Sequence, residues 1–223
     1  MWVNIPPNAT DDYVRGLAQL LKDSLDPSLN VYVEWANEVW NWMFPCAHWN
    51  LNEAIAEVAA GDPYHYNYDN CSNQGYWAWR RVPRVLKTHL DTMLEVFGEQ
   101  ERNRRIRGVY ASQIGSGMNF DGGPAAEALK YVRDVYGQPA GAFFYALAGA
   151  PYYGLGDMTH WDNLTEAMVL AKSQEVIESM IPTKANNFTQ SAVMGYRALA
   201  TVHNLSFVGY EGGPEFVFFF SKK

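Results

Sequence analysis

Hydrophobic residues along this chain recur with two alternating periods. Short runs that are apolar on both faces predict buried strands over residues 2–5, 31–36, 106–112, 142–147 and 205–210. Between them, apolar residues spaced three or four apart predict helices at about 10–25, 39–60, 75–98, 124–136, 163–180 and 185–203. Strands and helices therefore alternate along the whole chain.

This alternation predicts a parallel sheet covered by helices, as either a doubly wound sheet or a β/α barrel. No glycine-rich phosphate-binding loop follows any strand, which removes the usual support for the doubly wound, nucleotide-binding form. We expect the α/β class and a (β/α)8 TIM-barrel-like fold. The barrel is expected to be incomplete, because closure needs about eight strands and the pattern supplies about five. Residues 1–223 would form one partial barrel domain, with a helical and loop excursion at about 39–98.

The composition is that of a globular protein without a nucleic-acid surface. Of its 223 residues, 48% are hydrophobic and 18% charged, which is enough for one sizeable core. The formal net charge of −7 and the absence of a basic stripe argue against a nucleic-acid partner. No apolar run reaches the roughly 20 residues of a membrane span, and the first residues lack the pattern of a signal peptide.

Five Asn-x-Ser/Thr sequons favour an extracellular or secretory location. They begin at Asn8, Asn70, Asn163, Asn187 and Asn204. The oligomeric state does not follow from these patterns.

Cysteine and histidine residues show no recognisable metal-ligand spacing. Cys46 and Cys71 flank one polar segment, so they could form a single disulfide or remain two free thiols. The five histidines form no H-E-x-x-H motif and no zinc pattern with the cysteines. We expect neither a metal nor another cofactor.

Two glutamates stand at the carboxyl ends of predicted strands. Glu38 follows the strand at 31–36, and Glu211 follows the strand at 205–210, before two glycines. In a β/α barrel such ends converge on one mouth, and cleavage of a glycosidic bond needs a pair of carboxyl groups. Alternatively, Glu38 caps the next helix and Glu211 is a solvated loop residue. Two glutamates on matched strands, in a chain with 15% aromatic residues, favour the active-site interpretation.

Asn37-Glu38 closing one strand, and Glu211 closing the third strand after it, resemble the signature of a clan of retaining glycoside hydrolases. That cellulase-like clan has a (β/α)8 barrel, with the acid/base after an Asn at the end of strand four and the nucleophile at the end of strand seven. The resemblance implies a glycosidase that cleaves O-glycosidic bonds of a polysaccharide or oligosaccharide by double displacement. It makes Glu38 the acid/base and Glu211 the nucleophile. It also implies a fragment covering strands three to seven, without strands one, two and eight.

The resemblance also implies residues that bind the carbohydrate substrate. Asn37 matches the family's Asn that hydrogen-bonds the sugar 2-hydroxyl. Tyr152 or Tyr153, after the strand at 142–147, matches a Tyr that hydrogen-bonds the nucleophile. Trp40 is expected to stack on a sugar ring, and we expect Asn4, in the opening strand, to bind the substrate as well.

Two further expectations concern neighbouring side chains. Trp40 and Trp42, two apart on an expected helix, would lie on different faces, so that at most one lines the cleft. Glu34 lies at even spacing from Glu38, and we expect it to be a buried carboxylate paired with an arginine rather than a third catalytic group.

Two other functions stay open. The chain could be a catalytically inactive carbohydrate-binding protein derived from such a barrel. It could also be an unrelated α/β protein in which Asn37-Glu38 arose by chance, which a sheet that does not curve toward closure would favour.

Overall fold

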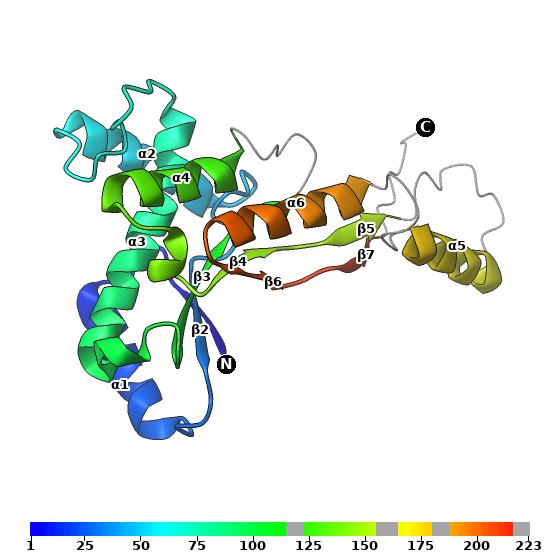
Figure 1. The fold of residues 1–223 in the computed structure, drawn as a ribbon, viewed down its shortest axis with the longest axis horizontal. Helices are drawn as coiled ribbons and strands as arrows, with labels where there is room; N and C mark the ends of the chain where they lie inside the picture. Colours follow the sequence, from blue (N-terminus) through cyan, green and yellow to red (C-terminus); the bar gives the residue numbers. More distant parts are fainter. Residues whose placement is uncertain (115–122, 155–164, 180–187, 216–223) are drawn as a thin grey trace.

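The computed structural model describes residues 1–114, 123–154, 165–179 and 188–215. In these segments five parallel strands form one sheet in the order β1-β2-β3-β4-β6, and helices alternate with the strands (Figure 1). These strands are β1 (Trp2–Ile5), β2 (Val31–Trp35), β3 (Ile106–Ala111), β4 (Ala146–Gly149) and β6 (Ser206–Gly209). The expected α/β class with about five parallel strands is confirmed.

The helices of the described segments occupy the connections between these strands. They are α1 (Asp11–Ser24), α2 (Pro45–Ala59), α3 (Gln74–Phe97), α4 (Pro124–Tyr136), α5 (Glu166–Ser179) and α6 (Phe188–Val202), with short 3-10 turns η1 (Glu99–Glu101) and η2 (Ala140–Ala142). Two short strands, β5 (Tyr152–Gly154) and β7 (Gly213–Glu215), pair beyond the ends of β4 and β6.

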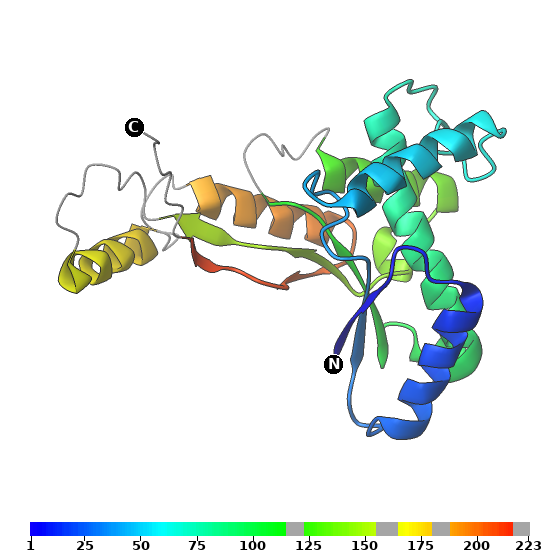
Figure 2. The ribbon, with the colours of Figure 1, turned by 180° about the vertical axis from the view of Figure 1, so that it is seen from behind.

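The strand order follows the chain order without reversal, which distinguishes this sheet from a doubly wound one. The helices α1, α3, α4 and α6 cover the same face, as Figures 1 and 2 show, and the sheet turns strongly from β1 to β6. A singly wound, turning parallel sheet with helices on one face is the arrangement found in a β/α barrel. In the described segments β1 and β6 are its two edges.

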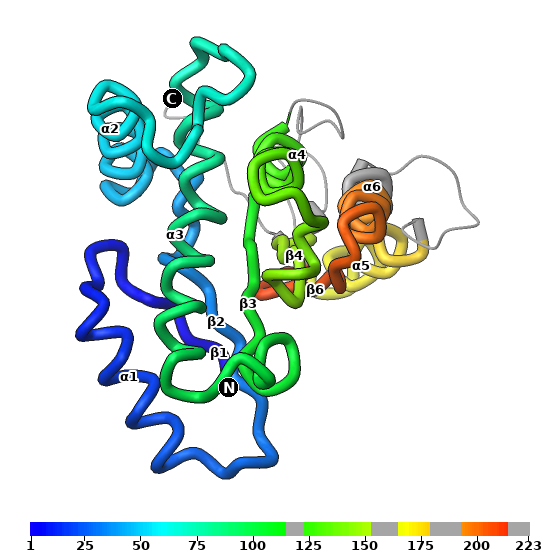
Figure 3. The backbone as a smooth tube through the Cα atoms, turned by 60° about the vertical axis from the view of Figure 1, so that its left-hand side comes forward, coloured from blue at the N-terminus to red at the C-terminus, as the bar shows by residue number. Residues whose placement is uncertain are grey.

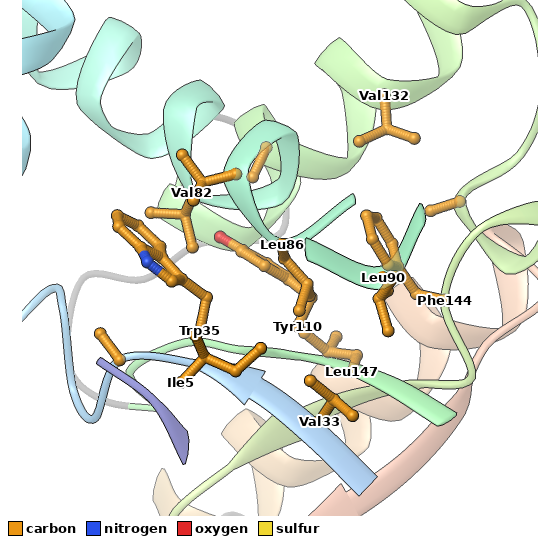
Figure 4. Close-up of a cluster of buried hydrophobic side chains, with 14 of the residues drawn as sticks. Ile5, Val33, Trp35, Val82, Leu86, Leu90, Tyr110, Val132, Phe144 and Leu147 are labelled. Atoms are coloured by element: carbon orange, nitrogen blue, oxygen red, sulfur yellow. The ribbon is translucent and has the colours of Figure 1, made fainter. Parts of the chain in front are cut away.

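The main core lies between the sheet and these helices. Helix α3 runs along β2 and β3 (Figure 3), and its Leu86 and Leu90 meet Val33 of β2 and Phe144 before β4 (Figure 4). Alternate strand residues point to the opposite face, where a smaller cluster includes Val109 and three alanines. Strands that bury both faces explain the apolar runs seen in the sequence.

Two predicted elements differ from those observed. The helix expected over 39–60 begins only at Pro45, because Ala36 and Glu38 adopt left-handed backbone conformations and residues 39–44 form turns. The strand expected over 142–147 begins at Ala146, because residues 140–142 form η2 and the chain turns and bends over residues 143–145.

Gly141 of η2 makes a close backbone contact that allows no side chain. Its N–H donates to the His203 carbonyl at 2.8 Å, and a Cβ here would lie 2.2 Å from the Asn204 carbonyl oxygen. We expect Gly141→Ala to lower the free energy of unfolding by about 1–3 kcal/mol, because backbone must move to admit the methyl group. Urea denaturation measures the change.

Gly16 provides the matched control, because it lies on the exposed face of α1 and a Cβ there meets nothing within 4 Å. Gly16→Ala is expected to raise stability by about 0.5–1 kcal/mol through helix propensity. Equal effects of the two substitutions would contradict the packing at Gly141.

Candidate active site

Glu38 stands in a sharp turn immediately after β2. Its backbone has φ of +48°, and that of Ala36 has φ of +59°. Left-handed conformations are uncommon for residues other than glycine and cost of order 1 kcal/mol or more each. Such strain clusters at functional sites, where the surrounding structure over-determines the local conformation. This turn ends β2 and directs the Glu38 side chain to the carboxyl edge of the sheet.

The two carboxyl oxygens of Glu38 have separate hydrogen-bond donors. Asn41 Nδ2 donates to Oε2 at 2.9 Å, and the Tyr210 hydroxyl donates to Oε1 at 3.4 Å. Asn41 comes from the same turn, whereas Tyr210 follows β6. The Glu38 carboxyl is therefore oriented by residues that follow β2 and β6, the two strands after which Glu38 and Glu211 stand.

Glu211 follows β6 at the same edge of the sheet and is exposed. The next residues continue into β7, where Gly213 has φ of +117° and pairs with Tyr152 of β5. A glycine suits this conformation because it has no Cβ. The segments that follow β4 and β6 are thereby held side by side, next to Glu211.

Glu34 is the buried carboxyl of this region, with 3% of the residue exposed. Trp2 Nε1 donates to its Oε2 at 3.0 Å, and Asn4 lies opposite it in the β1–β2 register. Burial raises the pKa of Glu34 to about 7, against the hydrogen bonds from Trp2 and Asn4, and the charges of Glu38 and Glu211 raise it further. The expectation of an arginine partner was wrong: the donors to Glu34 are the Trp2 indole and the Asn4 side chain, both from the neighbouring strand.

The pKa of Tyr210 is affected by the same carboxyl groups as the pKa of Glu34. Burial raises the pKa of its phenol most, and the negative charges of Glu38, Glu211 and Glu34 raise it further. At neutral pH Tyr210 therefore remains a hydrogen-bond donor. Because Tyr210 directly precedes Glu211 and its hydroxyl donates to Glu38, the structure brings the two segments that carry the predicted glutamates together at this edge of the sheet.

The predicted substrate-binding residues lie in the segments around these carboxyl groups and differ in their exposure and contacts. Asn37 is exposed beside Glu38, and Asn4 Nδ2 donates to the Ala36 carbonyl at 2.9 Å, which ties β1 to the strained turn. Tyr152 is 40% exposed in β5. The backbone of Tyr153 also belongs to β5, and its side chain lies outside the described parts of the molecule.

Trp40 packs against the site from the turn before α2. Its ring lies 6.1 Å from that of Tyr210, centroid to centroid. Trp40 and Trp42 both line a narrow apolar pocket, together with Trp79 of α3. The expectation that only one of Trp40 and Trp42 could line a cleft was wrong, because this segment is a turn rather than a helix.

Sequence reasoning assigned no role to Trp2, Asn41 or Tyr210. Tyr210 and Val208 lie two apart, and Trp2 and Asn4 are likewise two apart, so strand period places each pair on one face of the sheet. That period was the available signal for Tyr210 and Trp2. Asn41 carried no such signal, because its contact depends on the turn.

A buried acid with a raised pKa makes stability depend on pH. Glu34 has an ordinary pKa of 4.5 and a folded-state pKa of about 7, so the folded protein binds more protons between these values. Stability is therefore lost as pH rises through this window, by about 3 kcal/mol in total. Glu34→Gln keeps an acceptor for Trp2 and removes the ionisation. We expect its free energy of unfolding, relative to the parent, to increase by about 3 kcal/mol from pH 4 to pH 8.

Urea denaturation of both proteins at a series of pH values measures this difference. A difference that stays constant with pH would show that Glu34 ionises normally in the folded protein. Glu95→Gln, on the exposed face of α3, is the control, and its difference from the parent should vary little over the same range.

Cys46 and Cys71 are free thiols, which resolves the alternatives that the sequence left open. Burial raises the pKa of the Cys46 thiol. Within the segments that the structure describes, no three His, Cys, Asp or Glu side chains gather as metal ligands would. No helix among these segments is long and apolar enough to cross a membrane.

Comparison with known proteins finds no matching family model, no matching curated protein and no matching solved structure.

Proposed function

We propose that this protein is a glycoside hydrolase that cleaves O-glycosidic bonds of a polysaccharide or oligosaccharide with retention of configuration. One observation carries the proposal: the hydroxyl of Tyr210, the residue before Glu211, donates to Glu38 Oε1 at 3.4 Å, so the ends of β2 and β6 that carry the two glutamates meet. Double displacement at a sugar requires a pair of carboxyl groups that flank the scissile bond.

In the proposed mechanism Glu211 Oε attacks the anomeric carbon while Glu38 gives its proton to the leaving oxygen. The bond to the leaving group breaks as the glycosyl-enzyme bond forms. Glu38, now ionised, takes a proton from water, whose oxygen attacks the same carbon and releases Glu211. Two inversions return the original configuration at that carbon.

The surrounding groups support these roles. Asn41 and Tyr210 donate to the two oxygens of Glu38 and so hold the carboxyl in one orientation. Glu211 is exposed and accessible to a substrate. Trp40, packed on Tyr210, offers an aromatic ring next to the carboxyl groups, and sugars stack their apolar faces on such rings.

The test is hydrolysis of β-linked glucans, mannans and xylans by the purified chain, followed by proton NMR of the first product formed. We expect release of reducing ends, with the product initially in the anomeric configuration of the substrate. Initial formation of the opposite anomer would overturn the assignment of Glu211 as nucleophile. Binding of these glycans without release of reducing ends would instead identify a non-catalytic carbohydrate-binding protein.

A further inference from the structure

A second pocket lies between the segment that joins β1 to α1 and the helices α2 and α3. Its volume is about 390 Å³, which is in the range of pockets that hold small organic molecules and far above the roughly 30 Å³ that one water occupies. The residues that line it include Asn8, Asp11, Trp49, Arg81, Arg84 and His89.

We propose that this pocket binds a small carboxylic acid whose other end carries hydroxyl or ammonium groups, as in a uronic acid or an amino acid. The proposal does not rest on the glycosidase function, because Glu38, Glu211 and the groups that contact them do not line this pocket.

Arg81 and Arg84 are the cations of the pocket. They lie three residues apart on α3 and therefore share one face of the helix. Glu57 of α2 holds both side chains, since its Oε1 accepts from Arg81 Nε at 3.2 Å and from Arg84 Nη2 at 2.7 Å. The two guanidinium groups are thus held in place before a ligand arrives, which reduces the cost of ordering them on binding.

Each guanidinium keeps one nitrogen for a ligand. Arg81 Nη2 lies 4.0 Å from Glu53 Oε2, beyond hydrogen-bond distance, and Arg84 Nη1 makes no hydrogen bond within the described segments. Trp49, whose ring centre lies 4.9 Å from the Arg81 guanidinium, adds an indole N–H that has no partner in these segments either. Three donors, two of them charged, match a carboxylate, whose two oxygens accept several hydrogen bonds.

The residues contributed from the segment before α3 disfavour a bare anion. Asp11 opens α1 and is exposed, and its carboxylate repels a second anion but accepts hydrogen bonds from hydroxyl or ammonium groups. Asn8, in the segment before α1, adds an exposed amide. A ligand with a carboxylate toward α3 and donors toward α1 therefore satisfies both sides of the pocket.

His89 is the buried, neutral part of the lining. It is 5% exposed, and within the described segments neither of its ring nitrogens has a hydrogen-bond partner. Burial lowers the pKa of His89 to about 4; the charge of Asp11 acts against this effect, and the charges of Arg84 and Arg81 add to it. At pH 7 the ring is therefore uncharged. Its unpartnered nitrogens, which are rare among buried polar groups, keep this wall polar.

The test follows binding to the whole chain at pH 7 by proton–nitrogen NMR, with the Trp49 indole N–H as the reporter. D-Glucuronate and L-serine are the two probes of the proposed class. D-Glucose supplies hydroxyl groups without a carboxylate, and acetate supplies a carboxylate without the second end. The Trp2 indole, which donates to Glu34, is the internal control, and Trp49→Phe assigns the reporter signal.

We expect glucuronate or serine to shift the Trp49 signal saturably and to bind about tenfold or more tightly than either glucose or acetate. Binding of glucuronate alone identifies an acidic sugar as the ligand, and binding of serine alone identifies an amino acid. Glucose binding as tightly as both probes would overturn the role of the carboxylate. Equal binding of acetate, or no saturable shift with either probe, would also overturn the proposal.

Arg84→Lys tests the cations by isothermal titration calorimetry with the probe that binds. It keeps a positive charge beside Glu57, but a lysine ammonium cannot serve Glu57, the Tyr66 hydroxyl and a ligand together. We expect the Kd to rise by about tenfold or more, because hydrogen bonds between charged groups contribute that much. Arg15→Lys, which changes an exposed arginine of α1 paired with Glu95, is the matched control and should leave the Kd unchanged.

Trp49→Phe is the second variant, because it keeps an aromatic ring under Arg81 and removes only the indole N–H. We expect its Kd to rise severalfold, and a Trp2 indole signal at its parent position shows that either variant is folded. A Kd equal to that of the parent in both folded variants would overturn the proposed site.

Discussion

Glu211→Ala is expected to lower the rate of glycoside hydrolysis by about 10⁴-fold or more, with little change in folding. The substitution removes the carboxylate that we propose forms the glycosyl-enzyme, and water at the same place is a far weaker nucleophile. Glu211 is exposed, so its truncation leaves no buried cavity. Steady-state rates on an aryl glycoside and thermal unfolding of the same preparations measure the two effects.

Chemical rescue provides the sharper version of this experiment. The space left by the Glu211 side chain admits a small anion such as azide, whose nitrogen can attack the anomeric carbon as the leaving group departs. The product should be a glycosyl azide of inverted configuration, since only one displacement occurs. Rescue without inversion, or a loss below about tenfold, would contradict the nucleophile assignment.

Glu38→Ala separates the acid from the nucleophile. The phenol of an activated aryl glycoside is acidic enough to leave as its anion, without a proton from the enzyme. Glu38→Ala should therefore slow the cleavage of this substrate much less than the cleavage of a natural glycan. Glu95→Ala, which removes an exposed carboxylate on α3, is the control and should leave both rates unchanged. Equal losses on both substrates in Glu38→Ala would contradict its role as the acid.

Arg80→Met is expected to lower the free energy of unfolding by about 3–5 kcal/mol. The Arg80 side chain is fully buried on α3. It donates to both oxygens of the Asp69 carboxylate at 2.8 and 2.7 Å, to Glu127 Oε2 at 3.1 Å and to the Tyr66 carbonyl at 2.6 Å. Methionine fills similar space but leaves the largely buried Glu127 carboxyl without its cation.

Urea denaturation at neutral pH measures this loss, and two variants serve as controls. Arg15→Met removes an exposed arginine from its pairs with Glu95 and Asp12, and should cost about 0–1 kcal/mol. Arg80→Met combined with Glu127→Gln should recover part of the loss, because the stranded charge is removed. A loss under 1 kcal/mol for Arg80→Met alone would show that the network does not hold α3 and α4 to the segment between α2 and α3 that carries Tyr66 and Asp69.

Local sequence determined most of the secondary structure. Helix α4 was predicted at its observed bounds, because Pro124 fits the first helical turn and Gly137 adopts the left-handed conformation that ends it. The strands were recognisable because both of their faces are buried. The turn at 39–44 was not predicted. Ala36 and Glu38 adopt left-handed conformations that redirect the chain before Pro45, and neither residue type indicates such a conformation in a sequence.

The sequence by itself also determined where the two glutamates of the proposed mechanism lie, since the positions of Glu38 and Glu211 after two strands follow from periodicity. Only the tertiary structure decided their surroundings. The Trp2 indole reaches Glu34 across 32 residues, and the Tyr210 hydroxyl reaches Glu38 across 172. The physical reason is that strand register and burial, rather than local propensity, select these partners, and burial in turn raises the pKa of Glu34 to about 7.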